Sequence, residues 1–423
     1  MRDDFLCYNK HVNLADLLIK NIPSTQLDLI RRIADDASEF GFPVYLVGGS
    51  VRDLMLARPI VDVDLTLAGD AIKLARALVK KHGGELTAHD KFHTATWFFN
   101  SPISNLQSLD LISARKETYH HPGALPTVTK STIDDDLRRR DFTINAMAIR
   151  LDGDHFGELL DPLGGQKDIE TKLIRVLHPN SFADDPTRIF RAVRYAARYG
   201  FEIDLETLSL INSESLKVLP VLSGERLRHE FDLIFVERDY PLMFARLAEL
   251  KVLEAIETPT FNEKYSSLVD EAPEEKLGVT HHRVTLGYLL WLADSTTATI
   301  QNLSQKLAFT AELTDVLLSA SKLKQILPEL QNGKPSRWTF AIEKMSLASI
   351  FGIYLMTREK SLMEFLSTWR HVKPVTTGDD LKARGLEPGP KFKEILLRLR
   401  AAWLDGEVKT EEEELSLLKM IIS

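Results

Sequence analysis

The spacing of apolar residues changes along the chain. In its N-terminal part, short apolar runs predict strands over residues 44–47 and 109–113, and a hairpin formed by residues 85–88 and 94–99. From Phe182 onward, apolar residues recur at helical spacing with little interruption. The sequence therefore predicts a small sheet followed by a long helical part.

Two amphipathic stretches flank the first predicted strands. Residues 13–40 carry leucine and isoleucine at helical spacing and are broken at Pro23, because proline cannot continue a helix. Residues 70–81 predict another helix, which Gly83 and Gly84 stop. We expect the helices within 13–40 to pack against the sheet that begins at Val44.

The segment VYLVGGSVRD predicts a strand, a glycine turn and a short helix. Gly48 and Gly49 form the turn, Ser50 occupies the expected N-cap, and Arg52 follows inside the helix. Glycines let backbone N–H groups approach an anion closely, and a guanidinium adds a forked donor. The turn is therefore a candidate phosphate site, although a double glycine alone also fits an ordinary turn.

Acidic and apolar residues alternate directly after this helix, in Val61-Asp62-Val63-Asp64-Leu65. A strand over 61–65 would place Asp62 and Asp64 on one face, with their Cα atoms roughly 6.5 Å apart. Both carboxylates could then bind one or two Mg²⁺ ions. A half-solvated strand would carry the same pattern, but the neighbouring glycine turn and Arg52 favour metal binding.

A third acid, Asp110, occupies the predicted strand 109–113. If that strand lies beside the first acidic strand, Asp110 would supply the carboxylate that orients or deprotonates a nucleophile.

Residues 114–136 contain two histidines, two prolines and a glycine, which predicts a mobile loop without a long element. His120 and His121 have no partner at metal-ligand spacing, so a solvated loop fits them better than a metal site. The loop ends in a charged run that closes with Arg138-Arg139-Arg140-Asp141 and leads directly into apolar sequence. That position fits a wall of a phosphate pocket better than a solvated face.

Arginines recur on one face of a helix predicted to begin near Asp184, with Asp184 at the N-cap and Pro186 in the first turn. Spacings of three, three and four residues put these side chains together: Arg188, Arg191, Arg194 and Arg198. Taken alone, a salt-bridged surface helix and a ligand-binding face explain the pattern equally well.

Further helices are predicted over residues 224–235, 240–256, 296–330 and 340–368. We interpret His281 and His282 as structural or surface residues. Basic residues then gather around the turn Pro388-Gly389-Pro390, and a basic helix after a stiff turn can hold an RNA backbone. The candidates for RNA binding are Lys382, Arg384, Lys391 and Lys393.

Composition narrows the class of protein. A chain of 423 residues is too long for one ordinary core and predicts about three domains. The net charge of −8 argues against a surface coated in nucleic acid, although a local basic face can exist within an acidic total. Cys7 is the only cysteine, which excludes an intrachain disulfide and fits a reducing cytoplasm. No signal peptide pattern and no apolar span of membrane length is present, so we expect a soluble, cytoplasmic protein.

The motifs occur in a recognisable order: GGSVRD, DVDLTL, LDLISAR, RRRDFTINAMA, DDPTRIFRAVRYAARYGF and GERLRHEF. From Gly48 to Phe231 this order resembles the class II tRNA nucleotidyltransferases, the CCA-adding enzymes, and their bacterial poly(A) polymerase relatives. The resemblance implies an α+β fold, with a small mixed β-sheet head followed by an all-helical neck, body and tail. The expected domains are the catalytic head at 23–155, the neck at 156–236, the body at 237–350 and the tail at 351–423.

The resemblance also implies roles for single residues. Asp62, Asp64 and Asp110 would be the catalytic carboxylates and would bind Mg²⁺. Asp185 and Arg188 would contact the base. The remaining nucleotide-binding residues would be Gly48, Gly49, Arg52, Arg140, Asp141, Arg191 and Arg194. The family usually has Glu-Asp where this chain has Asp184-Asp185.

The implied reaction is attack of a tRNA 3′-hydroxyl on the α-phosphate of CTP or ATP, with pyrophosphate leaving and two metals stabilising the charge.

Full CCA addition is the first expectation, because the loop at 114–136 is not shortened. Enzymes that add only CC or only A share these motifs, so both stay open. A poly(A) polymerase is disfavoured by the GGSVRD turn and by the basic tail. A catalytically quiet RNA-binding module is disfavoured by the three carboxylates. The sequence leaves the oligomeric state open.

Overall fold

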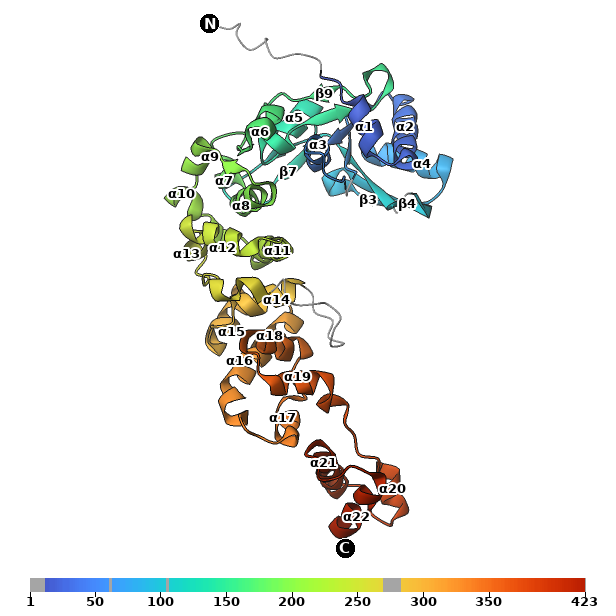
Figure 1. Ribbon diagram of the computed structural model, residues 1–423. Coiled ribbons are helices and arrows are strands. Elements are labelled where there is room, and N and C mark those ends of the chain that lie inside the picture. Colours follow the sequence, from blue (N-terminus) through green and yellow to red (C-terminus); the bar gives the residue numbers. More distant parts are fainter. Residues whose placement is uncertain (1–11, 61–62, 104–105, 269–282, 423) are drawn as a thin grey trace. The chain divides into compact units, whose positions relative to one another are not determined.

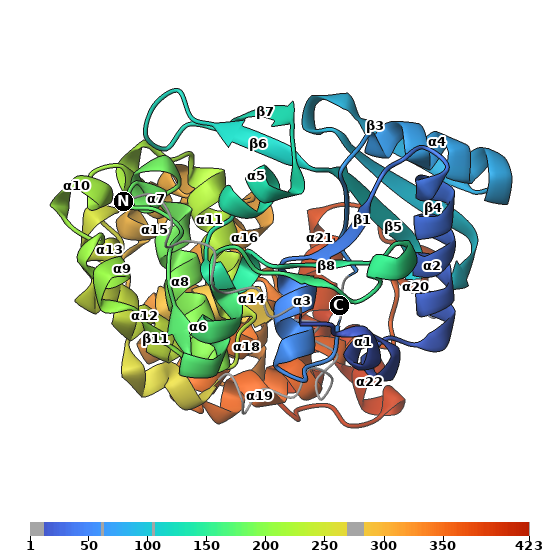
Figure 2. The same cartoon turned by 90° about the horizontal axis from the view of Figure 1, so that it is seen from above.

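The structure is a computed structural model that describes residues 12–60, 63–103, 106–268 and 283–422. The chain forms two compact units that divide between Leu222 and Ser223. The first unit contains the sheets and the second is helical (Figures 1 and 2). The predicted α+β fold is therefore confirmed, while the finer division at 155, 236 and 350 stays a prediction.

A mixed seven-stranded sheet forms the centre of the first unit, with strand order β3-β4-β5-β2-β1-β8-β9. Every neighbouring pair is antiparallel except β2 and β5, which run parallel. The strands are β1 Val44–Val47, β2 Leu65–Leu67, β3 Glu85–His89, β4 Thr94–Ile103, β5 Leu106–Ser113, β8 Ala148–Arg150 and β9 Leu159–Leu160. The predicted hairpin and the predicted strands at 44–47 and 109–113 are confirmed.

The helices that the apolar spacing predicted in the first unit are present, and packing of those within 13–40 against the sheet stays a prediction. The break at Pro23 separates α1, Ala15–Asn21, from α2, Ser24–Ser38. Helix α4, Ala71–His82, begins after the side-chain cap of Asp70 and ends at Gly83, whose φ is +78°. Helix α4 packs on β4 and β5, and α2 lies beside α4 (Figure 1).

The expectation of a mobile loop at 114–136 is wrong. Strands β6, Arg115–Thr118, and β7, Thr127–Lys130, pair as an antiparallel hairpin, and α5, Ile133–Arg138, follows it. The glycine and prolines that suggested a loop fall in the tip between the two strands, where turn residues are at home. Figure 2 shows this hairpin standing apart from the large sheet, next to α5.

The first unit ends in short elements that surround one longer helix, α8. They are α6 Gly165–Thr171, β10 Leu173–Ile174, α7 Ser181–Asp184, α8 Thr187–Tyr199, β11 Glu202–Ile203, α9 Leu205–Ser209 and α10 Ser213–Leu216. Strand β10 precedes α8 in the sequence and β11 follows it, and the two strands pair in parallel. Helix α8 contacts both strands.

The helices predicted for the second unit are confirmed, although several are divided. They are α11 Gly224–Phe235, α12 Tyr240–Glu249, α13 Val252–Ala255, α14 Arg283–Trp291, α15 Thr297–Lys306, α16 Ala311–Leu330, α17 Pro335–Ile342, α18 Leu347–Thr357, α19 Lys360–Ser367, α20 Gly378–Ala383, α21 Pro390–Leu404 and α22 Glu411–Ile422. His281 and His282 lie outside the described residues. No helix in the described ranges has the length and apolar character that a membrane crossing needs.

Candidate active site

The first unit contains a polar pocket of about 410 Å³. Its walls come from α3, Gly49–Met55, from Asp64 before β2, from the β6–β7 hairpin, from residues 139–145, and from Asp185 and α8. The residues that line it are Gly49, Arg52, Asp64, Glu117, Tyr119, Arg139, Arg140, Asp141, Asn145, Asp185, Arg188, Arg191 and Tyr195. Eight of these residues were predicted from the sequence. Gly48, Asp110 and Arg194 do not line it, and Asp62 lies outside the described residues.

The glycine turn brings the backbone against an arginine. Gly48 has φ +68°, and a Cβ at this position would meet the Arg140 guanidinium, which would have to shift. The positive φ favours glycine here, because a side chain would strain this backbone conformation. The expectation of Ser50 as the N-cap is wrong, because Gly48 occupies the cap and Ser50 is already buried within the first turn of α3.

The register of the sheet places two of the predicted carboxylates side by side. Leu65 of β2 pairs with Leu111 of β5 in parallel, so the residues before them, Asp64 and Asp110, are neighbours on one face. Of the predicted strand over 61–65, residues 61 and 62 lie outside the described residues, and residues 63 and 64 precede β2, which begins at Leu65. Asp64 nevertheless continues the ladder, because its carbonyl accepts from Val47 N at 3.3 Å.

Asp110 is exposed, and its carboxylate accepts a hydrogen bond of 2.6 Å from Thr96 Oγ1 on β4. Within the described residues, which omit Asp62, no group of three histidine, cysteine or acidic side chains is arranged to hold a metal ion. A carboxylate pair from two adjacent strands still has the oxygen chemistry that Mg²⁺ takes.

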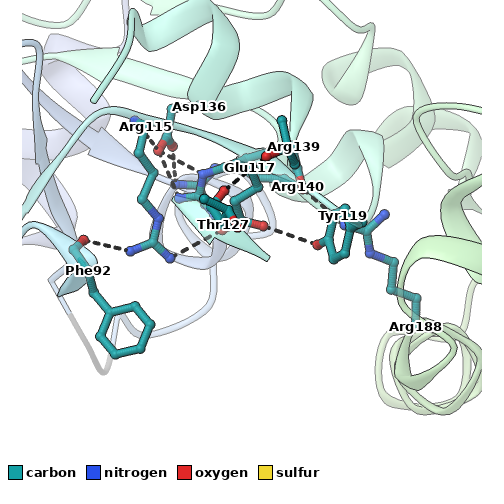
Figure 3. A network of polar contacts seen from close by, with 10 residues as sticks. Phe92, Arg115, Glu117, Tyr119, Thr127, Asp136, Arg139, Arg140 and Arg188 are labelled. Carbon is teal, nitrogen blue, oxygen red and sulfur yellow. Dashed lines mark hydrogen bonds and ion pairs between the residues drawn. The ribbon is translucent and has the colours of Figure 1, made fainter. Parts of the chain in front are cut away.

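A buried carboxylate gathers the arginines of the RRRD segment. Asp136, with no exposed surface, pairs with Arg139 Nη2 at 2.8 Å and with Arg140 Nη2 at 3.0 Å (Figure 3). Burial alone would raise the pKa of Asp136, but the two guanidinium groups outweigh it and hold the pKa below its ordinary value. The charged run is thus a pocket wall, as predicted, and Asp136 is its anchor.

The hairpin supplies a second acid to the same network. Glu117 accepts from Arg139 Nη1 at 2.9 Å and from Tyr119 Oη at 3.1 Å, and it pairs with Arg115 at 3.3 Å (Figure 3). Burial and the adjacent Glu117 carboxylate raise the pKa of Tyr119 to about 12, so its hydroxyl stays a hydrogen-bond donor at neutral pH. At the hairpin tip His120 bonds Thr127, in line with its interpretation as part of a polar loop.

Helix α8 presents its predicted arginines unequally. Arg188 is 3% exposed, and its Nη1 donates to Ser181 Oγ at 2.7 Å while its Nη2 donates to the carbonyl of Arg139 at 3.0 Å. Arg191 pairs with Asp141 at 2.6 Å. Arg194 is buried, with its guanidinium 5.0 Å from the centre of the Tyr195 ring. An exposed salt-bridged surface helix is therefore excluded for Arg188 and Arg194.

The start of α8 also differs from the expectation. Asp184 is not the N-cap, since it is the last residue of α7. Asp185 takes that role in part, because its Oδ1 accepts from Thr187 N at 3.2 Å and from Thr187 Oγ1 at 2.7 Å. These bonds fix the direction of a carboxylate that lines the pocket.

Arg139 was predicted only as part of the charged run, and sequence reasoning did not single out four lining residues: Glu117, Tyr119, Asn145 and Tyr195. Asn145 stands inside the quoted RRRDFTINAMA motif, so its neighbours could have drawn attention to it. Glu117 and Tyr119 lie in the segment interpreted as a loop, where no local pattern marks them.

The predicted RNA-binding residues lie in the second unit, on α20 and around the start of α21. Lys391 and Lys393 are exposed, whereas Lys382 pairs with Asp379 at 3.0 Å. Arg384 is exposed as well. A groove of about 650 Å³ beside them has apolar walls and a cationic rim, and its lining residues are Lys373, Pro374, Thr376, Gly389, Phe392, Lys393, Leu396, Leu397 and Arg400.

Comparison with known proteins agrees with this arrangement. Residues 44–175 match the family described as the poly A polymerase head domain. An A-adding tRNA nucleotidyltransferase of Halalkalibacterium halodurans is 33% identical, and the match covers 96% of this chain and 95% of that protein. A CCA-adding enzyme of Geobacillus sp. is 27% identical over 90% of this chain and 94% of its own length.

Solved structures agree as well. A Thermotoga maritima CCA-adding enzyme complexed with tRNA is 28% identical and has a TM-score of 0.77. That match covers 97% of this chain and 99% of the other.

The Asp136 network predicts a large and specific loss of stability. Asp136→Asn keeps the shape but removes a buried charge that pairs with two half-buried guanidinium groups, so urea denaturation should give a free energy of unfolding lower by about 3 to 5 kcal/mol. Because the folded pKa of Asp136 is lowered, its contribution is complete above the unfolded value of about 4 and is lost as the pH falls through the folded value. The deficit should therefore shrink in acid.

Asp134→Asn is the matched control, since Asp134 is exposed and makes only a surface pair with Arg138. Equal losses in the two variants, or an Asp136→Asn deficit that does not change with pH, would contradict the assignment.

Proposed function

This chain belongs to the class II family of tRNA nucleotidyltransferases and poly(A) polymerases, and we propose that it adds the terminal adenosine to the 3′ end of tRNA from ATP. The observation that carries the proposal is the end-to-end match to an A-adding relative at 33% identity, against 27% for the CCA-adding relative. Full CCA addition, the first expectation from the sequence, is the second candidate. It is favoured by Asp185 and Arg188, whose acceptor and donor groups can hydrogen-bond either cytosine or adenine.

The carboxylates would hold the metal. Asp64 and Asp110 supply oxygen ligands from adjacent strands, and Asp62 would be the third member of the set. Mg²⁺ bound there would stabilise negative charge on the attacking and leaving oxygens. Asp110 is also suited to orient the 3′-hydroxyl of the RNA, because its hydrogen bond from Thr96 fixes the carboxylate.

The arginines would receive the triphosphate. Arg52, Arg140 and Arg191 line the pocket, and the Gly48-Gly49 turn brings backbone close to Arg140. Guanidinium groups bind phosphate oxygens with two parallel hydrogen bonds, so they orient the triphosphate as well as neutralise it. A fixed triphosphate presents its α-phosphate to the hydroxyl in a constant position, which lowers the entropy cost of transfer.

Asp185 and Arg188 would select the base. A carboxylate only accepts hydrogen bonds and a guanidinium only donates them. Opposite adenine, Asp185 would accept from the N6 amino group while Arg188 donates to N1; opposite cytosine, the partners are N4 for Asp185 and N3 and O2 for Arg188. Arg188 Nη1 donates to Ser181 and Nη2 to the Arg139 carbonyl, so one further N–H on each Nη could serve a base, whereas Nε is buried.

The first test uses three tRNA substrates, ending before CCA, after C and after CC, each with ATP or CTP. We expect extension only of the tRNA that ends in CC, and only with ATP. Asp110→Asn should keep the fold and lose this activity, because the amide cannot replace a charged ligand. Incorporation of both CTP and ATP would favour full CCA addition, incorporation of CTP alone would favour CC addition, and failure to extend any of the three would refute the proposed function.

The second test concerns Asp185. Asp185→Ala should reduce the preference for ATP over GTP by about tenfold or more, because guanine presents a carbonyl where adenine has an amino group, and one opposed contact costs about 1 to 3 kcal/mol. Asp184→Ala is the control, since Asp184 does not line the pocket. Kinetics with all four nucleotides give the ranking, and an unchanged ranking in Asp185→Ala would remove this residue from base selection.

The third test concerns the tail, where we propose that Lys382, Arg384, Lys391 and Lys393 bind the tRNA backbone. Charge reversal at Lys391 and Lys393 should weaken tRNA binding and reduce its salt dependence by about one unit per lost phosphate contact. Affinity for ATP should not change. Lys322→Glu on α16, outside the groove, is the control. Equal salt slopes for the double variant and the parent protein would exclude the tail from the RNA interface.

A further inference from the structure

We propose that Asn145 is a positioning residue that couples Arg52 on α3 to Arg191 on α8, so that the two guanidinium groups act on the nucleotide as one unit. The inference rests on the proposed function, because it concerns how that pocket holds its triphosphate. What carries it is a continuous chain of two hydrogen bonds and one ion pair that links pocket-lining residues through one side-chain amide.

The amide of Asn145 is used at both ends. Its Oδ1 accepts from Arg52 Nη1 at 2.6 Å, and its Nδ2 donates to Asp141 Oδ1 at 2.9 Å. The residue is 5% exposed and ends a tight turn, Thr143–Asn145, in which its own backbone N donates to the Phe142 carbonyl at 3.0 Å. The side chain is therefore held where it meets an arginine on one side and a carboxylate on the other.

On the α3 side, Arg52 is fully oriented before any ligand arrives. Its Nε and Nη2 donate to the Asp53 carboxylate at 3.0 and 2.9 Å, and its guanidinium carbon lies 4.7 Å from the centre of the Tyr199 ring. With the bond to Asn145, Arg52 uses three of its five N–H groups. Arg52 lines the pocket, and one further N–H on Nη1 and one on Nη2 could donate to a ligand there.

On the α8 side, Asp141 connects Asn145 to Arg191. Its Oδ1 also accepts from Phe142 N at 2.8 Å, and its Oδ2 pairs with Arg191 at 2.6 Å. Burial alone would raise the pKa of Asp141, but Arg191, Asn145 and Arg188 together hold it below its ordinary value, so the carboxylate is charged at neutral pH. The direction of Arg191 thus depends on a carboxylate that Asn145 orients.

Only an amide satisfies this position. The side chain must accept from a guanidinium and donate to a carboxylate at the same time, and among side chains of this size only asparagine has an acceptor and a donor on one planar group. Aspartate would keep the acceptor for Arg52 but would oppose Asp141 with a second carboxylate. Alanine would leave both partners without their bond.

The test is a double-mutant cycle read out as ATP binding. Asn145→Ala and Arg191→Ala should each weaken ATP binding by about tenfold. The double variant should be little worse than either alone, because the side chains act through one chain of bonds although they do not touch. In the addition reaction, Asn145→Ala should raise KM for ATP more than it lowers kcat.

Thr143→Val is the structural control. Thr143 stands in the same turn and donates to Asp168 Oδ2 at 2.6 Å, so its loss perturbs the turn without touching the bridge. Asn145→Asp adds a second comparison, because it should weaken ATP binding although it keeps the acceptor for Arg52.

Three results would overturn the inference. They are additive losses in the cycle, an equal loss of ATP binding in Thr143→Val, and unchanged binding in Asn145→Asp. The proposed function would still stand in each case if the parent protein adds the terminal adenosine. If the parent protein neither binds ATP nor extends tRNA, both proposals fall.

Discussion

Five arginine side chains line one pocket, and the site depends on the buried carboxylates that offset their mutual repulsion. Asp136 holds Arg139 and Arg140, while Asp141 holds Arg191. A buried ion pair contributes little net stability, because desolvation costs roughly what attraction returns. Its effect here is on geometry, since guanidinium groups that are already oriented need no reorganisation when an anion arrives.

The same carboxylates explain why several elements meet at this place. Asp136 lies in α5, the short helix after the β6–β7 hairpin, and Glu117 in the hairpin bonds the same Arg139. The carbonyl of Arg139 then accepts from Arg188 on α8. Hairpin, connecting segment and helix are therefore joined by polar bonds. The sheet makes a separate contribution, because the parallel pairing of β2 with β5 sets Asp64 beside Asp110.

Much of the pocket could be predicted from local sequence, because local chemistry decides those positions. Gly48 has a positive φ that favours glycine, and the arginines of α8 follow helical spacing. Glu117 and Asn145 escaped notice because their roles come from partners distant in the chain: Arg139 for one, Arg52 for the other. The two misplaced caps, Ser50 and Asp184, have a further reason. Each residue suits a cap, but the turn begins beside it, and propensity alone does not decide between neighbouring positions.

The shared bonds of Glu117, Asp136 and Arg139 also constrain how this protein can change over time. Replacement of any one breaks at least one buried or half-buried ion pair of the shared network, at a cost of up to about 3 to 5 kcal/mol, which is a large part of the stability of an ordinary domain. Substitutions at these three positions are therefore expected to occur together, or through an intermediate sequence whose loss of stability the protein tolerates. An engineer who transplants α8 from a relative with different nucleotide preference would have to bring the hairpin and residues 136–140 from the same donor.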